Sequence, residues 1–338
     1  GLIGSRIPDV GNPWLDAGIV PFSTLSYNKD KDYWKKWFPA DFVVECFPGQ
    51  FRNWFYSLLA MATVMEKKPP FKTLLGHALV KDETGRDMHK SWGNAIWFED
   101  AAEKMGVDVM RWLYASQNPE HNLNFGYNIA DDVRKNLITL WNTYSFFITY
   151  ANLDGFDPQI DMVNYKDYTN LDKWIISKMH DLIKEADEAY SSYKVFQLMK
   201  SITKFIDDLS NWYVRRSRRR FWRSENNIDK KAAYSALYQV LLDLTKVMSP
   251  IIPFVSEKIY QNLVIQKGKE ESIHLCNFPV FEKEYYDEEL MKNIDSIISI
   301  VSQGRSARNR ANIKNRQPLQ TVYIYIPKQK NITLDDSS

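Results

Sequence analysis

Cysteine is scarce in this chain, and long apolar runs are missing. Its 338 residues include two cysteines, Cys46 and Cys276, which lie far apart. That spacing excludes a Cys-x-x-Cys metal knuckle and argues against a disulfide framework, so we expect no zinc site and a reduced, cytoplasmic environment. No apolar run is long enough to span a bilayer, and the first residues lack the charged-then-apolar order of a signal peptide. We therefore expect no membrane association.

Net charge is also small. Lys and Arg total 44 against 42 for Asp and Glu, which gives a net charge of +2. Bulk charge therefore identifies no partner, and any site for a polyanion must come from local clustering. Hydrophobic residues make up 44% of the chain, ample for buried cores, and the length suggests roughly two domains. Because the chain begins without Met, our working expectation is a piece of a longer protein.

A polar loop lies between an apolar, strand-like run at 74–80 and a helical pattern at 97–105. It reads Gly-Arg-Asp-Met-His-Lys-Ser-Trp-Gly-Asn at 85–94. A mobile ammonium such as that of Lys90 suits a phosphate chain, because Lys is a flexible point charge that can follow a moving group. On the local pattern alone, a solvated hairpin with one surface lysine is the commoner explanation.

This loop resembles the Lys-Met-Ser-Lys-Ser signature loop of class I aminoacyl-tRNA synthetases, in the form used by the enzymes for isoleucine, valine and leucine. The resemblance implies that Lys90 holds the phosphates of ATP, supplied with Mg²⁺, that Ser91 assists it, and that Met88 and His89 belong to the ATP site. Asp87 stands where the family has its first signature lysine, and His89 stands where it has its first serine. Asp87 would repel a polyphosphate, so the implied role rests on Lys90.

Upstream, residues 41–66 read as a strand, a Pro-Gly turn and a helix. In a parallel α/β sheet, ligands bind at the carboxyl ends of strands, where Glu45, Gln50 and Arg52 fall. The segment resembles Glu-Gly-x-Asp-Gln-x-Arg-Gly-Trp-Phe of the isoleucine enzymes, which implies that Glu45 and Gln50 contact the aminoacyl adenylate. This chain has one extra residue between the two. From the residues alone, a strand-end ion pair for Glu45 and a surface charge for Arg52 are equally good interpretations.

The first residues carry a weaker signal. Residues 7–22 contain Gly and Pro at intervals too short for a long helix, so we expect a turn-rich, aromatic segment. Its Trp-Leu-Asp-Ala-Gly run at 14–18 resembles Trp-Phe-Asp-Ser-Gly of the isoleucine and valine enzymes, which implies that Trp14 and Asp16 border the adenylate site. Asp16 is equally well explained as a turn cap.

From Gly126 onward the hydrophobic period is helical. Apolar stripes over 129–151, 174–190, 195–213 and 233–248, with a further helix opened by Pro253, predict a helix bundle. A helix over 288–307 and an alternating strand over 321–326 follow. We expect a mainly α fold with an α/β amino-terminal part. The resemblance divides it into the end of a Rossmann-type catalytic domain at 1–125, a helical anticodon-binding domain at 126–290 and the start of a carboxyl-terminal region at 291–338.

The third stripe runs into a cluster of arginines. One helical face carries Arg215, Arg218 and Arg219, and another carries Arg216, Arg220 and Arg223. Such crowding needs an anion, acidic neighbours or a polynucleotide backbone to offset the repulsion, and Trp222 offers a stacking surface. Contact with phosphates is one interpretation. Internal pairing is an equally good one, with candidate partners Asp207, Asp208, Glu225 and Asp229.

The run Leu-Ser-Asn-Trp-Tyr-Val-Arg-Arg-Ser-Arg-x-Arg-Phe-Trp at 209–222 is closely similar to the anticodon-binding domain of isoleucine enzymes. Motifs at 248–257, 272–279 and 308–319 resemble the same enzymes in the same order, so the resemblance covers nearly the whole chain. It implies an isoleucine–tRNA ligase, monomeric, with tRNA, isoleucine and ATP as partners and the arginines on the tRNA. Gln-x-Arg-x-Trp-Phe and Arg-Gln-Pro-Leu favour isoleucine over valine or leucine.

The altered loop leaves an alternative, which is a tRNA-binding module or a synthetase paralogue without activity. No two of the five histidines have just two residues between them, so the His-x-Gly-His nucleotide motif of class I enzymes is missing from this chain. We therefore expect the chain alone to bind tRNA but to form no aminoacyl adenylate.

Overall fold

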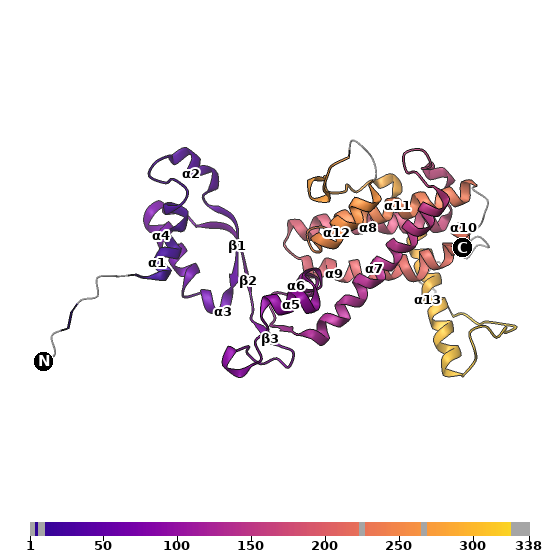
Figure 1. The fold of residues 1–338 in the computed structure, drawn as a ribbon, viewed down its shortest axis with the longest axis horizontal. Helices are drawn as coiled ribbons and strands as arrows, with labels where there is room; N and C mark the ends of the chain where they lie inside the picture. The colour runs from indigo at the N-terminus through magenta and orange to yellow at the C-terminus, as the bar shows by residue number, and fades with distance from the viewer. Residues whose placement is uncertain (1–3, 6–10, 223–226, 265–268, 326–338) are drawn as a thin grey trace. The chain divides into compact units, whose positions relative to one another are not determined.

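The computed structural model describes residues 4–5, 11–222, 227–264 and 269–325 (Figure 1). Two compact units emerge from the contacts within the chain. An amino-terminal unit comprises Gly1–Asp100 and Gln117–Ile129, and a helical unit comprises Ala101–Ser116 and Ala130–Ser338. Within the described part, no helix combines the length and apolar character needed to cross a membrane.

The amino-terminal unit is built on a parallel strand pair. Strands β1 (Ala40–Cys46) and β2 (Phe71–His77) lie side by side, with Ala40 opposite Phe71 and Cys46 opposite His77. Parallel neighbours need a crossover connection, which here contains the short helix α3 (Phe47–Gln50) and then α4 (Trp54–Glu66). This confirms the strand, turn and helix predicted over 41–66.

Helix α1 (Pro13–Ser23) contradicts the turn-rich segment expected at its position. Asn12 caps it and Pro13 occupies its first turn, where a missing N–H costs nothing. Pro21 leaves the Ala17 carbonyl without its helical donor, and the indole Nε1 of Trp54 donates to that carbonyl at 3.4 Å. Gly18 permits close packing on α4, because a Cβ there would lie 2.8 Å from Ser57 Cβ. The Gly and Pro residues therefore serve helix packing.

The same unit contains an aromatic cluster and a second strand pair. Trp34 of α2 (Lys31–Trp37) stacks on Phe38 with a centroid distance of 4.6 Å, and its Nε1 donates to the Pro21 carbonyl at 3.0 Å. Strand β3 (Val80–Asp82) pairs in parallel with β4 (Leu123–Phe125). The polar loop follows β3.

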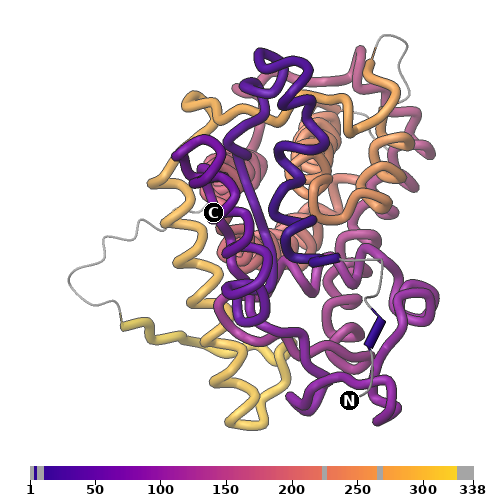
Figure 2. The backbone as a smooth tube through the Cα atoms, turned by 90° about the vertical axis from the view of Figure 1, so that its left-hand side faces the viewer, coloured from indigo at the N-terminus to yellow at the C-terminus, as the bar shows by residue number. Residues whose placement is uncertain are grey.

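The helical unit confirms the predicted bundle. Its buried centre is α11 (Ile228–Met248), which packs against α8 (Asn170–Ser191), α10 (Arg215–Trp222) and α12 (Pro253–Leu263). Further helices are α6 (Val107–Ala115), α7 (Tyr127–Asp154) and α9 (Val195–Asp207). The first boundary between the two units along the chain falls within α5 (Phe98–Met105). Figure 2 shows several of these helices end-on. The domain boundaries expected near 125 and 290 stay predictions.

The third predicted stripe is a continuous helical rod whose middle is a π-helix. Residues Asp208–Val214 adopt the wider π turn between α9 and α10. Such segments are rare and frequently occur at functional sites. Asp208 within it accepts ion pairs from Lys204 at 3.1 Å and from Lys178 of α8 at 3.5 Å. The π segment is thus tied to a neighbouring helix just before the arginines begin.

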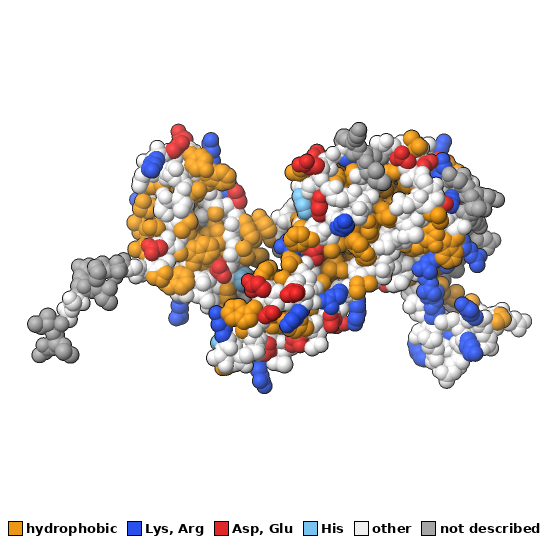
Figure 3. Space-filling view, viewed as in Figure 1, with side chains coloured by type: hydrophobic (Ala, Val, Ile, Leu, Met, Phe, Trp, Pro, Cys, Tyr) orange, Lys and Arg blue, Asp and Glu red, His pale blue; other side chains and the backbone are white. Residues whose placement is uncertain are grey.

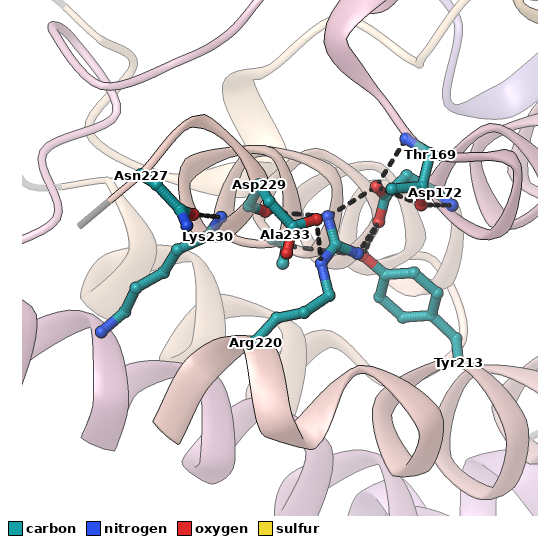
Figure 4. Close-up of polar contacts among 8 residues, drawn as sticks. All are labelled: Thr169, Asp172, Tyr213, Arg220, Asn227, Asp229, Lys230 and Ala233. Carbon is teal, nitrogen blue, oxygen red and sulfur yellow. Dashed lines mark hydrogen bonds and ion pairs between the residues drawn. The ribbon is translucent and has the colours of Figure 1, made fainter. Parts of the chain in front are cut away.

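A buried carboxylate joins three helices of this unit (Figure 4). Asp172, which is fully buried, forms a reciprocal capping box with Thr169 at the start of α8. Its two oxygens accept from Arg220 of α10 at 2.7 and 2.8 Å, and Oδ1 also accepts from the hydroxyl of Tyr213 at 2.7 Å. Arg220 donates in addition to the Asp229 carbonyl at the start of α11, at 2.8 Å. Burial opposes the charge of Arg220, but the Asp172 carboxylate overcomes it and raises the pKa of the guanidinium.

Helix α13 (Glu288–Arg310) docks on α8 and confirms the helix predicted over 288–307. Lys178 pairs with Asp295 at 3.1 Å, and the Asp287 N–H donates to Ser177 Oγ at 2.6 Å. The chain then reverses direction, as Figures 1 and 2 both show. The strand predicted over 321–326 is wrong for its described part, 321–325, which has no strand. An alternating pattern forms a strand only against a partner, and no described residue pairs with it.

We predict that Asp172→Asn lowers the free energy of unfolding of the helical unit by about 3–5 kcal/mol, because it removes the fully buried partner of the Arg220 charge and leaves the partly exposed Asp229 as its ion-pair partner. Urea denaturation followed by circular dichroism measures the change. Asp187→Asn, at an exposed position of the same helix, is the matched control and should stay within about 0.5 kcal/mol of the parent chain. Equal stability of the two variants would contradict the role given to Asp172.

Candidate nucleotide and nucleic-acid sites

Asp82, the last residue of β3, organises the polar loop. Its Oδ1 accepts from the backbone N–H groups of Thr84 and Arg86, each at 2.9 Å, and from Thr84 Oγ1 at 2.8 Å. Its Oδ2 accepts from the amide of Asn94 at 2.9 Å. These donors, with Asn94 the strongest contributor, hold the pKa of Asp82 far below its usual value. A charged carboxylate therefore fixes the turn from which the loop begins.

Asn94 closes the loop at its other end. Besides its bond to Asp82, its Nδ2 donates to the Asp87 carbonyl at 2.8 Å, and its Oδ1 accepts from the His89 N–H at 3.0 Å. Gly85 and Gly93 have φ of +86° and +70°, in the left-handed region that favours glycine. The chain thus reverses direction at the two glycines of the sequence pattern, and Asn94 joins the two ends of the loop.

The negative charge of Asp87 is compensated within the loop. The ammonium of Lys81, which is largely buried, pairs with Asp87 Oδ1, and the two residues also form a bridge between their backbones. The hydrogen bond and the charge of Lys81 lower the pKa of Asp87. The repulsion of a polyphosphate by Asp87, expected from the sequence, is therefore reduced by a lysine six residues earlier.

Lys90 is exposed on the surface of this loop. It begins a one-turn 3₁₀ helix, Lys90–Trp92, and its Nζ lies 4.4 Å from the ring centroid of Trp97. Such a cation–π contact holds an ammonium without neutralising it. Ser91 and His89 are exposed, Met88 is half-buried, and the His89 ring contacts Trp92 edge-on at 4.3 Å. The loop thus presents one lysine that has no ion pair with any described carboxylate.

The candidate adenylate residues lie near the carboxyl ends of β1 and β2. There, a hollow of about 400 Å³ is lined in part by Pro48, Gly76 and His77. At the end of β1, one carboxylate oxygen of Glu45 accepts a hydrogen bond from the N–H of the adjacent Cys46 at 2.8 Å. Gln50, at the end of α3, caps α4 by accepting from the Trp54 N–H at 3.2 Å. Glu45 thus forms no ion pair with a described residue.

Trp14 and Asp16 lie in the first turns of α1. Asp16 is in the first turn, where a carboxylate favours the helix N-terminus, and both side chains are exposed. The structure therefore places Asp16 in the first turn of a helix whose cap is Asn12, so the turn-capping role weighed for Asp16 falls to Asn12. Neither residue forms a hydrogen bond or an ion pair with Glu45 or Gln50, and their part in an adenylate site stays a prediction.

The arginines of α10 divide into two groups. Arg215, Arg216, Arg218 and Arg219 are exposed and form no ion pair with a described carboxylate, whereas Arg220 turns inward. Arg216 lies over the Trp212 ring at 5.0 Å, and Arg218 lies 5.9 Å from the Phe146 ring of α7. Figure 3 shows Lys and Arg side chains gathered where α10 and α13 lie. We call Arg215, Arg216, Arg218 and Arg219 the α10 arginines.

Arg220 is a correction to the predicted tRNA-binding set. Its guanidinium is held by Asp172, and its Nε lies 2.9 Å from Asp229 Oδ1, so it supports the bundle instead of facing a ligand. Among the carboxylates weighed as internal partners, Asp229 does pair with the cluster. Asp207 accepts from Asn211 instead, and Asp208 pairs with lysines. Arg223 and Glu225 lie outside the described residues.

Trp222 ends α10 with 56% of its side chain exposed, beside the α10 arginines. A second basic group follows along α13 and its turn, where Arg308 donates to the carbonyls of Lys314 and Gln317 at 3.0 and 2.7 Å. Its other cations are exposed, namely Arg305, Arg310, Lys314 and Arg316. Clustered cations beside an exposed aromatic ring are typical of surfaces that bind single-stranded or looped RNA.

Comparison with known proteins identifies two matching families along the chain. Residues 4–126 match the family of class I tRNA synthetases (I, L, M and V), and residues 172–324 match the anticodon-binding domain of tRNA ligases. This chain belongs to the class I tRNA synthetases. It is 43% identical over 330 residues to the isoleucine–tRNA ligase of Clostridium acetobutylicum and 37% identical over 328 residues to that of Thermus thermophilus. Each alignment covers 95% of this chain and 31% of the relative, so the chain spans about a third of their length.

A solved structure supports the fold of this synthetase chain. A ternary complex of LeuRS with tRNA and LeuAMS from Agrobacterium radiobacter aligns with a TM-score of 0.64 at 15% identity, covering 84% of this chain and 34% of that one. The expected fold class, a catalytic-domain end followed by a helical anticodon-binding domain, is confirmed. In the described part, no group of three or more His, Cys, Asp or Glu residues could hold a metal ion.

Sequence reasoning missed the residues that support these sites. Lys81, Asp82 and Trp97 lie just outside the ten-residue motif, yet they neutralise Asp87, fix the turn and hold Lys90. The Asp-x-Thr-Gly spacing at 82–85 is a turn signal that could have identified Asp82. Nothing in the local sequence around Asp172 indicates that it meets an arginine 48 residues later.

We predict that Asn94→Ala loosens the loop of this synthetase chain by removing three hydrogen bonds at once. Amide hydrogen exchange at Thr84, Arg86 and His89 should speed up roughly tenfold, since a net loss of about 1.4 kcal/mol is a factor of ten. Asn53→Ala, which removes one side-chain bond to the Gly49 carbonyl elsewhere in the same unit, should leave those amides unchanged. Unaltered exchange in Asn94→Ala would show that Asp82 holds the loop by itself.

Proposed function

We propose that this chain is the part of an isoleucine–tRNA ligase that binds tRNA through the α10 arginines and positions ATP through Lys90. The observation that carries the proposal is the set of four exposed arginines beside Trp222, none of which has an ion pair with a described carboxylate. An anticodon-binding match over 172–324 and the similarity to isoleucine–tRNA ligases support it.

The α10 arginines suit a folded RNA backbone. They project from a short, rigid helix that Arg220 fixes to Asp172, so their spacing is set before any ligand arrives. Pre-set cations lose less conformational entropy on binding than freely moving ones. Each contact with a phosphate releases condensed counterions, which makes the affinity depend on salt concentration. Trp222 adds a ring on which an unpaired base can stack.

Lys90 would act on the phosphates of ATP during activation of isoleucine. In that reaction the isoleucine carboxylate attacks the α-phosphorus, pyrophosphate leaves, and the acyl group then passes to the terminal ribose of tRNA. ATP would carry Mg²⁺, which offsets part of the phosphate charge. Lys90 stabilises the charge that develops on the leaving group, Ser91 can donate beside it, and Met88 and His89 border the nucleotide. Its contact with Trp97 keeps the ammonium near the loop but unpaired.

Glu45 and Gln50 would hold the aminoacyl adenylate. Glu45 uses one carboxylate oxygen on the Cys46 N–H, and its other oxygen can accept from the ammonium group of isoleucine. Gln50 uses its carbonyl oxygen on the Trp54 N–H and keeps its amide N–H groups for a ligand. Trp14 and Asp16 are assigned to the rim of the same site by resemblance. No observation favours the alternative of a module without activity, because Lys81 compensates the substitution at Asp87.

We predict that Lys90→Ala in the complete protein lowers the rate of isoleucine-dependent exchange of pyrophosphate into ATP by roughly 10²-fold or more, as for loss of one preorganised charge donor. Lys36→Ala, at an exposed position of α2, is the matched control and should exchange at the parental rate. A parental rate in Lys90→Ala would assign the phosphates to another group.

We predict that replacing Arg215, Arg218 and Arg219 with Ala weakens tRNA binding by this chain and flattens the slope of log affinity against log salt by up to about 3, because up to three phosphate contacts are lost. Filter binding at several salt concentrations measures both quantities. The control replaces three exposed lysines, which removes the same charge from the same unit: Lys184, Lys194 and Lys200. If both triple variants behave alike, only net charge matters and the α10 arginines are not the site.

A further inference from the structure

A second pocket, remote from the α10 arginines in sequence, lies within the helical unit. It has a volume of about 430 Å³ and is formed by α8, α11 and two connecting segments, 162–168 and 279–285. That volume is within the range of small-molecule sites. Its lining is divided between polar groups on α11 and rings and apolar side chains from the other three elements. Glu282, the second carboxylate of the lining, is exposed to solvent, whereas Asp243 is buried.

The polar side of the pocket is one face of α11. Gln239, Asp243 and Lys246 are spaced at i, i+4 and i+7, so they follow one another along the helix. Asp243 is only 7% exposed and accepts one hydrogen bond, from Gln239 Nε2 at 2.6 Å. An ionised carboxylate has about four acceptor positions, so most of its capacity is unused by the described residues.

Asp243 and Lys246 do not form an ion pair with each other. No ion pair within 4.0 Å joins them or links either of them to another described residue, although they are three residues apart and line the same pocket. Burial raises the pKa of Asp243, and the hydrogen bond from Gln239 and the charge of Lys246 oppose that rise. A buried carboxylate and an unpaired ammonium, side by side, favour a ligand that carries both opposite charges.

The remaining lining supplies a further donor and an apolar wall. His180 Nδ1 accepts from the Glu282 N–H at 3.2 Å, so the neutral ring carries its hydrogen on Nε2. Burial lowers the pKa of His180 and keeps the ring neutral. Tyr285 lies 5.2 Å from the His180 ring and 5.1 Å from the ring of Tyr165. These rings form a surface on which an apolar side chain can pack.

We propose that this pocket binds a free α-amino acid with an apolar side chain. Its ammonium group pairs with Asp243, its carboxylate pairs with Lys246 and accepts from His180 Nε2, and its side chain packs on Tyr165 and Tyr285. An organic cation would leave Lys246 without a partner, and an organic anion would leave Asp243 without one. A neutral nucleobase would satisfy neither charge fully. The zwitterion is the one class that matches both.

Isothermal titration of the 338-residue chain with L-phenylalanine tests the proposal, because this amino acid differs in shape from isoleucine and so avoids the proposed synthetase site. Binding should be at least tenfold tighter than for 2-phenylethylamine, which lacks the carboxylate, or 3-phenylpropionate, which lacks the ammonium. Asp243→Asn and Lys246→Met should each weaken it at least tenfold. Asp187→Asn and Lys258→Met, at exposed positions outside the pocket, are matched controls and should bind as the parent chain does.

Three results would overturn the proposal. They are no heat of binding with phenylalanine at millimolar concentration, equal binding of the amine alone, and tighter binding of guanosine than of phenylalanine. Denaturation midpoints of all four variants keep loss of binding separate from loss of fold. Lys246→Met is the decisive variant if Asp243→Asn is unstable, because Lys246 is only half-buried and forms no ion pair with a described residue.

Discussion

The ion pair between Asp172 and Arg220 is the interaction on which the helical unit depends. The Asp172 carboxylate links the start of α8 to the end of the π-containing rod, with Tyr213 as a further donor, and the Arg220 guanidinium extends the link to the start of α11. A buried ion pair adds little stability by itself, but removing either partner strands a charge in the interior. The geometry of α10, and with it the spacing of the exposed arginines, therefore rests on a contact that no tRNA would touch.

The same division between supporting and presented charge occurs in the polar loop. Lys81 forms an ion pair with Asp87, and Asp82 accepts four hydrogen bonds. Lys90, in contrast, contacts the Trp97 ring and has no ion pair with a described carboxylate. In both places the protein uses some charged side chains to fix the backbone and leaves others unpaired. A net charge of +2 conceals this arrangement, because pairing is decided by position and not by composition.

The pocket on α11 shows the reverse arrangement, in which two opposite charges three residues apart remain unpaired. On an exposed helix face such a pair would contribute little, but here Asp243 is buried and accepts one hydrogen bond, from Gln239. That imbalance distinguishes the pocket from the Asp172 network, where every charge has a partner of good geometry.

The sequence by itself determined the fold class, the helix stripes and the motifs. Helical and strand periods are local properties, and they placed α5, α11 and α13 within a few residues of their observed bounds. It failed at α1, where Pro21 and Gly18 looked like turn residues but serve contacts with α4, and at 321–325, where a strand pattern has no described partner. Both errors concern contacts between distant segments.

Only the tertiary structure decided which charges are free. Arg220 and Arg219 are neighbours in a run of identical residues, yet one is buried against Asp172 and the other is exposed. Local sequence cannot separate them, because the distinction depends on a carboxylate 48 residues away and on the turn of the π segment before them. Likewise, the motif identified Lys90, but the compensation of Asp87 by Lys81 required the bridge between the two sides of the loop.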